Sequence, residues 1–372
     1  MTIYLIVYCL LFLFALLERL DDHGEASGVL LRKNFYFICA VGLVFFGALR
    51  YETGFDYFSY ENIYQWFSGG LSVGRFEPGF AAFMHICKNI FGLSYPYFLF
   101  FLTASSLLIK FSFFYKYFKY PVFLLLMYFP AVFLYADFGQ IRQGMAVGIF
   151  LWAIPAIKNR KLFRFLIIWL AACSFHYSAL IFFPIYWFYK IKVTPKIFWA
   201  GLIFCFLFNA VSGAKVIFYA AMKIMGSSGL GEIMEYALDY GESANPLSFF
   251  LEINTLLVLC LIPLYQKVYA NTIKNGTEKH LEFSGYNVYI LMFLLIKMFD
   301  SISVIGYRGA YFYKMIEGIL LYYLMDKLKE KELKALFFLF LIFYGLIRLI
   351  FIIQKQAWQF VPYQIYGELF GL

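Results

Sequence analysis

Long continuous stretches of apolar residues, separated by short polar connections, dominate the hydrophobic pattern of this chain. A helix needs about 20 apolar residues to cross a membrane, whereas a membrane β-strand alternates apolar and polar positions over about 10. These stretches do not alternate, so the pattern predicts spanning helices, about twelve in number. They lie near residues 2–18, 34–49, 95–114, 121–136, 140–157, 163–175, 177–190, 197–212, 247–266, 285–299, 309–325 and 335–353.

The composition agrees with a chain that lies mostly within a membrane. Hydrophobic residues make up 63% of the chain, aromatic residues 23% and charged residues only 14%, whereas a soluble domain carries about 25% charged residues. No internal repeat or low-complexity linker divides the sequence. We therefore expect an all-α polytopic membrane protein in which residues 1–372 form a single transmembrane domain.

The positions of Lys and Arg predict which side of the membrane each connection faces, because these residues concentrate in cytoplasmic loops. If the N-terminus lies outside, most of the 31 Lys and Arg residues fall in such loops, and Lys110 is one of them. Residues 226–246 carry acidic residues but no Lys or Arg. This bias predicts that both termini are outside, with two larger outside loops at 50–94 and 213–246. The net charge of +9 is then a signal of topology rather than of nucleic-acid binding.

Once the sides are assigned, several polar residues collect on the outer face. Arg50 ends the second predicted span, Glu77 precedes a short apolar segment and Arg142 begins the fifth span. His176 separates the sixth and seventh spans, and Arg308 begins the eleventh. Since the Lys-rich loops set the assignment, the shared side of these five residues is an independent indication of a functional site.

Two short segments shape this outer face. Residues 79–92 are apolar but too short to span, so we expect an interfacial or re-entrant helix there. The helices around His176, which end near Arg164 and Lys190, reach only about 18–21 Å, against a hydrocarbon core of about 30 Å. His176 is therefore expected at the floor of a cavity; the alternative is a histidine that hydrogen-bonds a neighbouring carbonyl.

The residue types on this face suggest how an anionic substrate is held. An arginine that faces a cavity presents a planar fork that fits phosphate oxygens, and Arg142, Arg50 and Arg308 all qualify. Alternatively, Arg142 anchors its helix at the interface or pairs with Asp137. Tyr57 and Tyr60 are candidates to stack on sugar rings.

Two pairs of charges are expected inside the membrane. Lys314 and Glu317 lie three residues apart on one predicted helix and are expected to form an internal ion pair. Lys297 and Asp300 have the same spacing and are expected to pair likewise.

The polar segments together resemble a known family. Residues 50–60 are similar to the R-x3-G-x-D-Y-x2-Y signature of EpsG-like exopolysaccharide polymerases, which are relatives of the Wzy O-antigen polymerases. Three further pieces match in order, over a resemblance that covers roughly residues 40–190, and Arg308 with Tyr311 adds a weaker match. The three pieces are Glu77-Pro78-Gly79-Phe80, Arg142-Gln143-Gly144-Met145-Ala146 and Phe175-His176-Tyr177-Ser178-Ala179-Leu180.

The resemblance implies a multi-pass glycosyltransferase of the bacterial plasma (inner) membrane, with a C-type helical bundle and an active site that faces the periplasm or the outside. Such polymerases join oligosaccharide repeat units carried on undecaprenyl diphosphate into O-antigen or exopolysaccharide, one carrier being the donor and another the acceptor. Besides membrane lipid, a chain-length regulator and a flippase are the further partners that this implies. No Gly-rich phosphate loop and no DxD-like metal motif is present, so no cofactor, metal or nucleotide sugar is expected.

The reaction that the resemblance implies, together with the positions of the polar residues, suggests roles for individual residues. Arg142, with Arg50 and Arg308, is expected to bind the substrate diphosphate. The base that accepts the proton of the acceptor hydroxyl is expected to be Asp56, then His176, then Glu77; the alternative for Asp56 is an ion pair with Arg50. The sugar-binding residues are expected to be Tyr57, Tyr60, Gln143 and Tyr311.

Three other activities remain open from the sequence. An O-antigen ligase would use a similar donor with a lipid A core as acceptor. A flippase or transporter of the lipid-linked glycan would carry cationic residues at several depths and pseudo-symmetric halves. A membrane O-acyltransferase would also place a histidine deep in the membrane. The gathering of charge on one face and the signature at residues 50–60 favour the polymerase.

Overall fold

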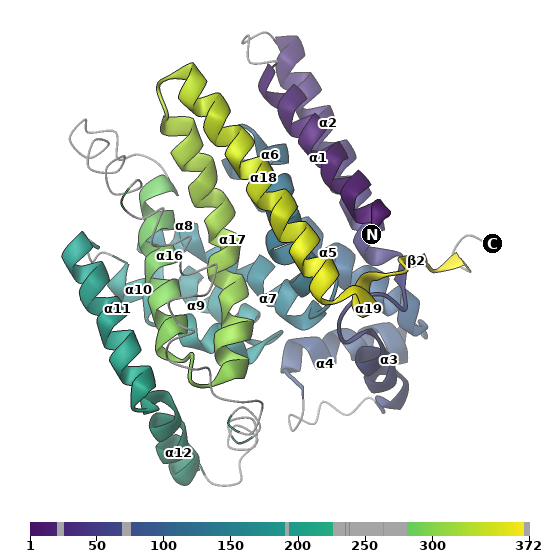
Figure 1. The fold of residues 1–372 in the computed structure, drawn as a ribbon. Helices are drawn as coiled ribbons and strands as arrows, with labels where there is room; N and C mark the ends of the chain where they lie inside the picture. The colour runs from purple at the N-terminus through teal and green to yellow at the C-terminus, as the bar shows by residue number, and fades with distance from the viewer. Residues whose placement is uncertain are drawn as a thin grey trace.

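The computed structural model describes residues 1–20, 26–68, 76–189, 193–225 and 281–367, together with the isolated positions 235, 238 and 263. The predicted span at 247–266 and most of the acidic loop at 226–246 lie outside the described residues. Within them the chain is almost entirely helical, as the hydrophobic pattern predicts, and the helices pack side by side into one tilted bundle (Figure 1).

Long helices form the frame of the bundle. Four of them are long and apolar enough to span a membrane: α1 (Thr2–Leu20), α2 (Ala26–Ala48), α5 (Tyr95–Tyr117) and α18 (Lys331–Lys355). The pair α11 and α12, bent by 64° at its break, is a fifth candidate. The part of the chain that the structure describes therefore contains four or five such spans by length and composition, and the expected number of about twelve stays a prediction.

Broken helices account for much of this difference. The apolar stretch near 121–136 forms α6 (Pro121–Tyr128) followed by π-helical turns, η2 (Phe129–Asp137). Pro130 has no backbone N–H to donate, and its ring hinders a continuous α-helix at this junction. Every residue of α6 is buried, so these short pieces form the centre of the bundle rather than its lipid-facing surface.

Other short and long elements complete the chain. Five shorter helices come next along the chain: α7 (Ile141–Leu151), α8 (Ala153–Lys158), α9 (Leu162–Cys173), η3 (Tyr177–Phe182) and α10 (Ile185–Phe188). They are followed by α11 (Pro195–Ala210), α12 (Gly213–Met225), α16 (Leu281–Met298) and α17 (Ser303–Lys327), and most described residues of α17 are buried. One end contains β1 (Arg50–Tyr51), α3 (Tyr57–Trp66), α4 (Pro78–His85), η1 (Ile86–Ile90), α19 (Ala357–Phe360) and β2 (Gln364–Ile365).

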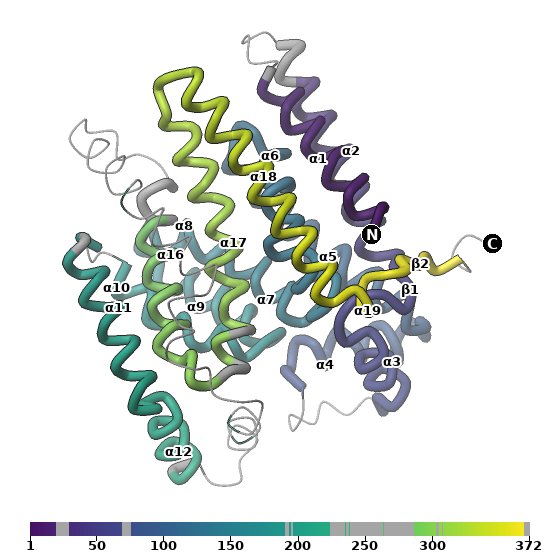
Figure 2. The backbone as a smooth tube through the Cα atoms, in the orientation of Figure 1, coloured from purple at the N-terminus to yellow at the C-terminus, as the bar shows by residue number. Residues whose placement is uncertain are grey.

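The short elements β1, α3, α4, α19 and β2 gather at one end of the bundle, where the tube in Figure 2 also places the N-terminus. The hydroxyl of Tyr4 in α1 donates to the carbonyl oxygen of Phe360 in α19 at 2.7 Å, which ties the two ends of the chain together. The expected short helix at residues 79–92 is present as α4 and η1. We refer to this end as the loop end.

The buried charges differ in part from the expected pattern. Lys110 does not lie in a cytoplasmic loop: it is fully buried within α5, with Nζ 2.7 Å from Oδ1 of Asp137. Asp137 therefore pairs with Lys110 rather than with Arg142. The pairing of Lys297 with Asp300 is confirmed at 3.1 Å.

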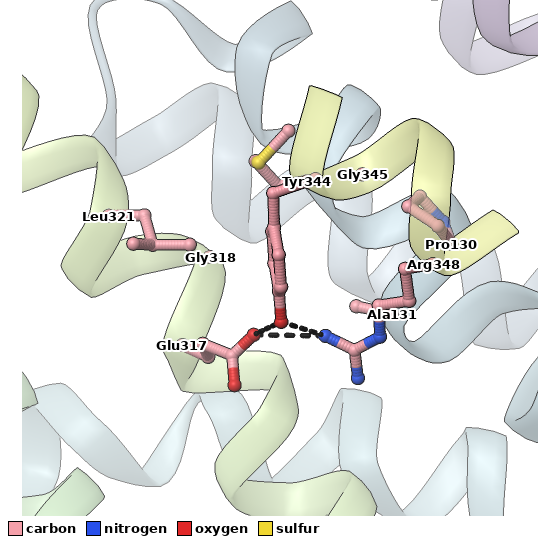
Figure 3. Close-up of a pocket in the computed structure, with 9 residues that line it drawn as sticks. Pro130, Ala131, Glu317, Gly318, Leu321, Tyr344, Gly345 and Arg348 are labelled. Carbon is pink, nitrogen blue, oxygen red and sulfur yellow. Dashed lines mark hydrogen bonds and ion pairs between the residues drawn. The ribbon is translucent and has the colours of Figure 1, made fainter. Parts of the chain in front are cut away.

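The pairing expected between Lys314 and Glu317 is wrong, because Glu317 binds a different cation. Oε1 of Glu317 accepts from Nη1 of Arg348 in α18 at 3.0 Å and from the hydroxyl of Tyr344 at 3.2 Å (Figure 3). This cluster borders a cavity of about 10 Å³, which is too small for a sugar or a lipid chain. We therefore regard the cluster as a structural link between α17 and α18.

Candidate functional site

The signature loop, residues 50–56, is held against the C-terminal segment. Arg50 and Tyr51 pair antiparallel with Ile365 and Gln364, and the N–H of Gly54 donates to the carbonyl oxygen of Gln359 at 2.7 Å. Gly54 has a φ of 102°, and a Cβ at this position would overlap the carbonyl oxygen of Phe138. Both facts require glycine here, so the small residue of the signature is explained by a close backbone contact.

Asp56 ends this loop in an unusual backbone conformation. Its φ of 59° and ψ of 10° lie in the left-handed region, which Asp tolerates better than most residues. Its carbonyl oxygen accepts from the N–H of Tyr60 and starts α3, but its carboxylate does not cap the helix. Asp56 is exposed at the loop end, so the carboxylate is available to a substrate.

Glu77 connects two of the motif pieces. Its Oε2 accepts from Nη1 of Arg142 at 2.7 Å, and its Oε1 accepts from the N–H of Tyr177 at 3.3 Å. The residue is only 4% exposed. Because both carboxylate oxygens are bonded within the protein, the geometry favours a role for Glu77 in positioning Arg142 over a role as base.

A glycine brings the same two pieces into contact. The N–H groups of Gly79 and Phe80, in the first turn of α4, donate to the carbonyl oxygen of Ser174 at 2.7 and 3.2 Å. A Cβ on Gly79 would lie 2.9 Å from that oxygen. The Glu-Pro-Gly piece thus fits against the end of α9, two residues before His176.

Arg142 lies in the first turn of α7 and is surrounded by aromatic rings. Its Cζ lies 5.4 to 5.9 Å from the ring centroids of Tyr60, Phe76 and Phe80, and its Nε lies 3.4 Å from the hydroxyl oxygen of Tyr60. The side chain keeps 19% exposure. Its Nη2 has no hydrogen-bond partner among the residues that the structure describes, which leaves one face of the guanidinium available.

His176 precedes η3 and caps it. Its Nδ1 accepts from the N–H of Ser178 at 3.1 Å and lies 2.7 Å from the hydroxyl oxygen of the same residue. The residue is 8% exposed. Burial, with the nearby charges of Arg142 and Arg308, holds the pKa of His176 well below its ordinary value, so the imidazole is neutral near pH 7.

Gln143 joins α7 to α17. Its side-chain Nε2 donates to the backbone carbonyl oxygen of Arg308, while its buried Oε1 has no hydrogen-bond partner in the described part of the chain. Gly309, directly after Arg308, packs against Ile296 of α16, where a Cβ would overlap the isoleucine side chain. These contacts place the Arg308 backbone beside the start of α7.

The electrostatic interactions show that these groups lie near one another. Partial burial raises the pKa of the Asp56 carboxyl above its ordinary value, and the charges of Arg308 and Arg142 oppose this rise. The pKa of Tyr60 is raised by burial, and Arg142, Asp56 and Arg308 all act on it. We define the site cluster by its members: Asp56, Tyr60, Glu77, Arg142, Gln143, His176 and Arg308.

Three predicted site residues lie within the protein interior instead. Arg50 is 3% exposed, donates to the carbonyl oxygen of Gly47 and stacks on Phe138 with its Cζ 4.9 Å from the ring centroid. Tyr57 is 3% exposed and packs edge-on against Tyr95, and Tyr311 is 1% exposed. Their burial favours structural roles: Arg50 supports the signature loop from below, and neither tyrosine presents a free ring to a sugar.

Sequence reasoning assigned no role to several residues that build the site. The C-terminal residues Gln359 and Gln364 hold the signature loop, and Ser174, Tyr177 and Ser178 hold Glu77 and His176. Most of these contacts use backbone atoms, so the residue types in the sequence do not reveal them. Only the repeated serines on either side of His176 offered a signal.

Comparison with known proteins adds one finding. The model of the EpsG family matches residues 33–365, nearly the whole chain. No curated protein and no solved structure matches the chain significantly. The matched range contains every member of the site cluster and extends through β2, which closes on the signature loop.

Proposed function

The chain belongs to the EpsG family, and from this membership we propose that it is a polysaccharide polymerase that acts on lipid-linked glycans at the outer face of the plasma membrane. In this proposal, one oligosaccharide on undecaprenyl diphosphate is the donor and the sugar end of another is the acceptor. The observation that carries the proposal is the convergence of two carboxylates, two arginines and a neutral histidine, contributed by separate segments of the chain, at one end of the bundle.

The reaction needs an oxygen nucleophile and an anionic leaving group. The acceptor hydroxyl attacks the anomeric carbon of the donor, the bond from that carbon to the diphosphate oxygen breaks, and the diphosphate departs with the bonding electrons. The hydroxyl proton passes to a base. A positioned base contributes about 10²–10⁴-fold to such a step, and fixed cations stabilise the charge that develops on the leaving group.

Asp56 is the proposed base. It is the exposed carboxylate of the site cluster, it lies within the electrostatic influence of Arg308 and Arg142, and partial burial raises its pKa above the ordinary value. Glu77, whose two oxygens are bonded to Arg142 and Tyr177, is the proposed positioning residue.

Arg308 and Arg142 are the proposed ligands of the diphosphate. Arg142 donates Nη1 to Glu77 and keeps Nη2 available, so it is oriented by one anion while it can bind another. Arg308 is partly exposed and acts electrostatically on Asp56, Tyr60 and His176. Tyr60 and Gln143, which the sequence suggested as sugar-binding residues, are only 5% and 0% exposed, so their proposed role is to support the two arginines: Tyr60 beside Nε of Arg142, and Gln143 at the backbone of Arg308.

The test is a deletion strain complemented with variants. With the wild-type gene we expect a ladder of long polysaccharide; with Arg308→Ala or Arg142→Ala we expect single repeat units on the lipid carrier or core. Arg142→Lys keeps the charge but loses the bidentate fork, so it should also be impaired. Lys334→Ala, which removes an exposed charge 4.0 Å from Asp326, is the matched control and should leave the ladder unchanged.

Three outcomes would redirect the proposal. A full ladder in the deletion strain would exclude the polymerase. Loss of every outer-face glycan, single units included, would instead indicate a flippase. Long chains that remain on the carrier and never reach the core would indicate a ligase.

A further inference from the structure

The hydrogen bonds of His176 determine which of its nitrogens carries the proton. The backbone N–H of Ser178 can only donate, so Nδ1, 3.1 Å away, must present its lone pair. A neutral imidazole with a free Nδ1 lone pair carries its proton on Nε2. The serine hydroxyl, 2.7 Å from the same Nδ1, can donate in addition.

The surroundings of His176 disfavour its charged form. Protonation of Nδ1 would set an N–H against the N–H of Ser178 and remove the side-chain cap of η3. It would also place a positive charge in the field of Arg142 from α7 and Arg308 from α17. Glu77, which accepts from the N–H of the neighbouring Tyr177, is already bonded to Arg142, and no acid of the described residues is among the groups that act on the pKa of His176.

The remaining nitrogen is the functional end of this side chain. Nε2 has no hydrogen-bond partner among the described residues and is not one of their fully buried polar atoms. An Nε2–H can donate but cannot accept, and the lone pair on Nδ1 is already used. This arrangement does not suit a general base.

We propose that His176 acts as a neutral hydrogen-bond donor, through Nε2–H, to an oxygen of the diphosphate that Arg142 and Arg308 hold. The inference rests on the proposed function and replaces the role of base that the sequence suggested for this residue. A neutral donor adds a hydrogen bond to the anion without the repulsion that a third cation would meet beside two arginines. Ser178 is the positioning residue that orients the ring through its backbone N–H.

Two substitutions separate the donor from the cap. In His176→Gln the amide nitrogen reaches the place of Nε2, so the donor is kept while the cap is weakened. In His176→Asn the side chain can still cap η3, as Asn does at helix starts, but it is too short to reach the substrate. Ser112→Ala, at an exposed serine of α5 whose hydroxyl donates to the carbonyl oxygen of Leu108 at 2.6 Å, lies outside the site cluster and serves as the matched control.

The first measurement is binding of farnesyl diphosphate to the purified full-length protein in detergent. A hydrogen bond to a charged group predicts at least about a tenfold weaker affinity in His176→Asn, with His176→Gln and Ser112→Ala within about threefold of wild type. The same order is expected for chain elongation. If His176→Asn binds and elongates normally, or if His176→Gln is as inactive as His176→Asn, the donor role is overturned.

The second measurement is nitrogen NMR of protein labelled in its four histidines, in which the His176 signal is the one that His176→Gln removes. We expect a neutral ring protonated on Nε2 from pH 8 down to pH values below the ordinary histidine pKa of about 6.5. A proton on Nδ1, or an imidazolium at pH 7, would overturn the inference. This readout needs no turnover, so it stays informative if the polymerase assignment itself fails.

Discussion

The ion pair between Glu77 and Arg142 gives the sharpest test of the site geometry. We consider Glu77→Gln, which keeps the shape of the side chain and removes its charge. The introduced amide can turn its single oxygen toward either Tyr177 or Arg142, so one N–H donor of the protein then faces the amide NH₂ group. The guanidinium of Arg142 also loses the anion that orients it.

The magnitude follows from burial. Removal of one partner of a buried ion pair costs about 3–5 kcal/mol. Glu77 is 5% exposed at its side chain but Arg142 is 19% exposed, and solvent screens part of its charge, so we expect about 2–3 kcal/mol. Arg142→Gln should cost a similar amount, and the double variant about 3 kcal/mol rather than the sum, which leaves a coupling energy of about 2 kcal/mol.

The assay is a titration of the purified protein in detergent micelles with SDS, which gives its free energy of unfolding. Glu61→Gln, at a partly exposed position of α3, is the matched control and should lie within about 0.5 kcal/mol of wild type. Additive effects, with a coupling energy below about 0.5 kcal/mol, would refute the pair. Glu77→Gln with full stability and no elongation would also contradict our reasoning, since it would identify Glu77 as the base.

Three further predictions concern the loop, the base and the interior. Asp56→Asn should abolish elongation with little change in stability. In wild type, the rate of elongation should fall as the pH drops through the raised pKa of Asp56, because the base must be deprotonated. A flat pH profile of the elongation rate would contradict this role. Gly54→Ala should destabilise the protein by several kcal/mol, because residue 54 has a positive φ and a Cβ there would overlap the backbone of Phe138. Gly42→Ala in α2, where the space around a Cβ is open, should be neutral or stabilising by up to about 1 kcal/mol in the same titration. Lys110→Met should lower the free energy of unfolding by about 3–5 kcal/mol, because it leaves the Asp137 carboxylate buried without its cation. The additional substitution Asp137→Asn should recover part of that loss. An unchanged stability in Lys110→Met would refute the buried pair.

Features that depend on short stretches of sequence were predicted well. The helical membrane character and the short helix at residues 79–92 follow from the length and apolarity of single segments, and both are present. The prediction that separate motif pieces meet at one face rested on the alternation of basic loops, and the structure brings Asp56, Arg142, His176 and Arg308 within electrostatic reach of one another. The number of spans was not determined in this way, since helices broken by proline-containing turns resemble straight ones in a hydrophobic pattern.

The partners of the charged residues depended on contacts between distant segments. Arg142 lies near Asp137 in sequence but binds Glu77, and Glu317 was expected to bind Lys314 but binds Arg348. Sequence spacing favours neighbours on one helix, whereas in a tightly packed interior a charge binds the opposite charge that adjacent helices bring to it.

The sequence by itself determined that this is a helical membrane protein with arginines, carboxylates and a histidine at one face, because apolar length and charge bias are local properties that the membrane imposes on every segment. Only the tertiary structure decided which of those residues are available to a substrate. Arg50 is covered by the bundle, Glu77 is used by Arg142, and the lone pair of His176 is used by a backbone N–H. A polar side chain is available to a substrate only if atoms of other segments do not already form its hydrogen bonds. Those hydrogen bonds depend on packing between residues far apart in the chain.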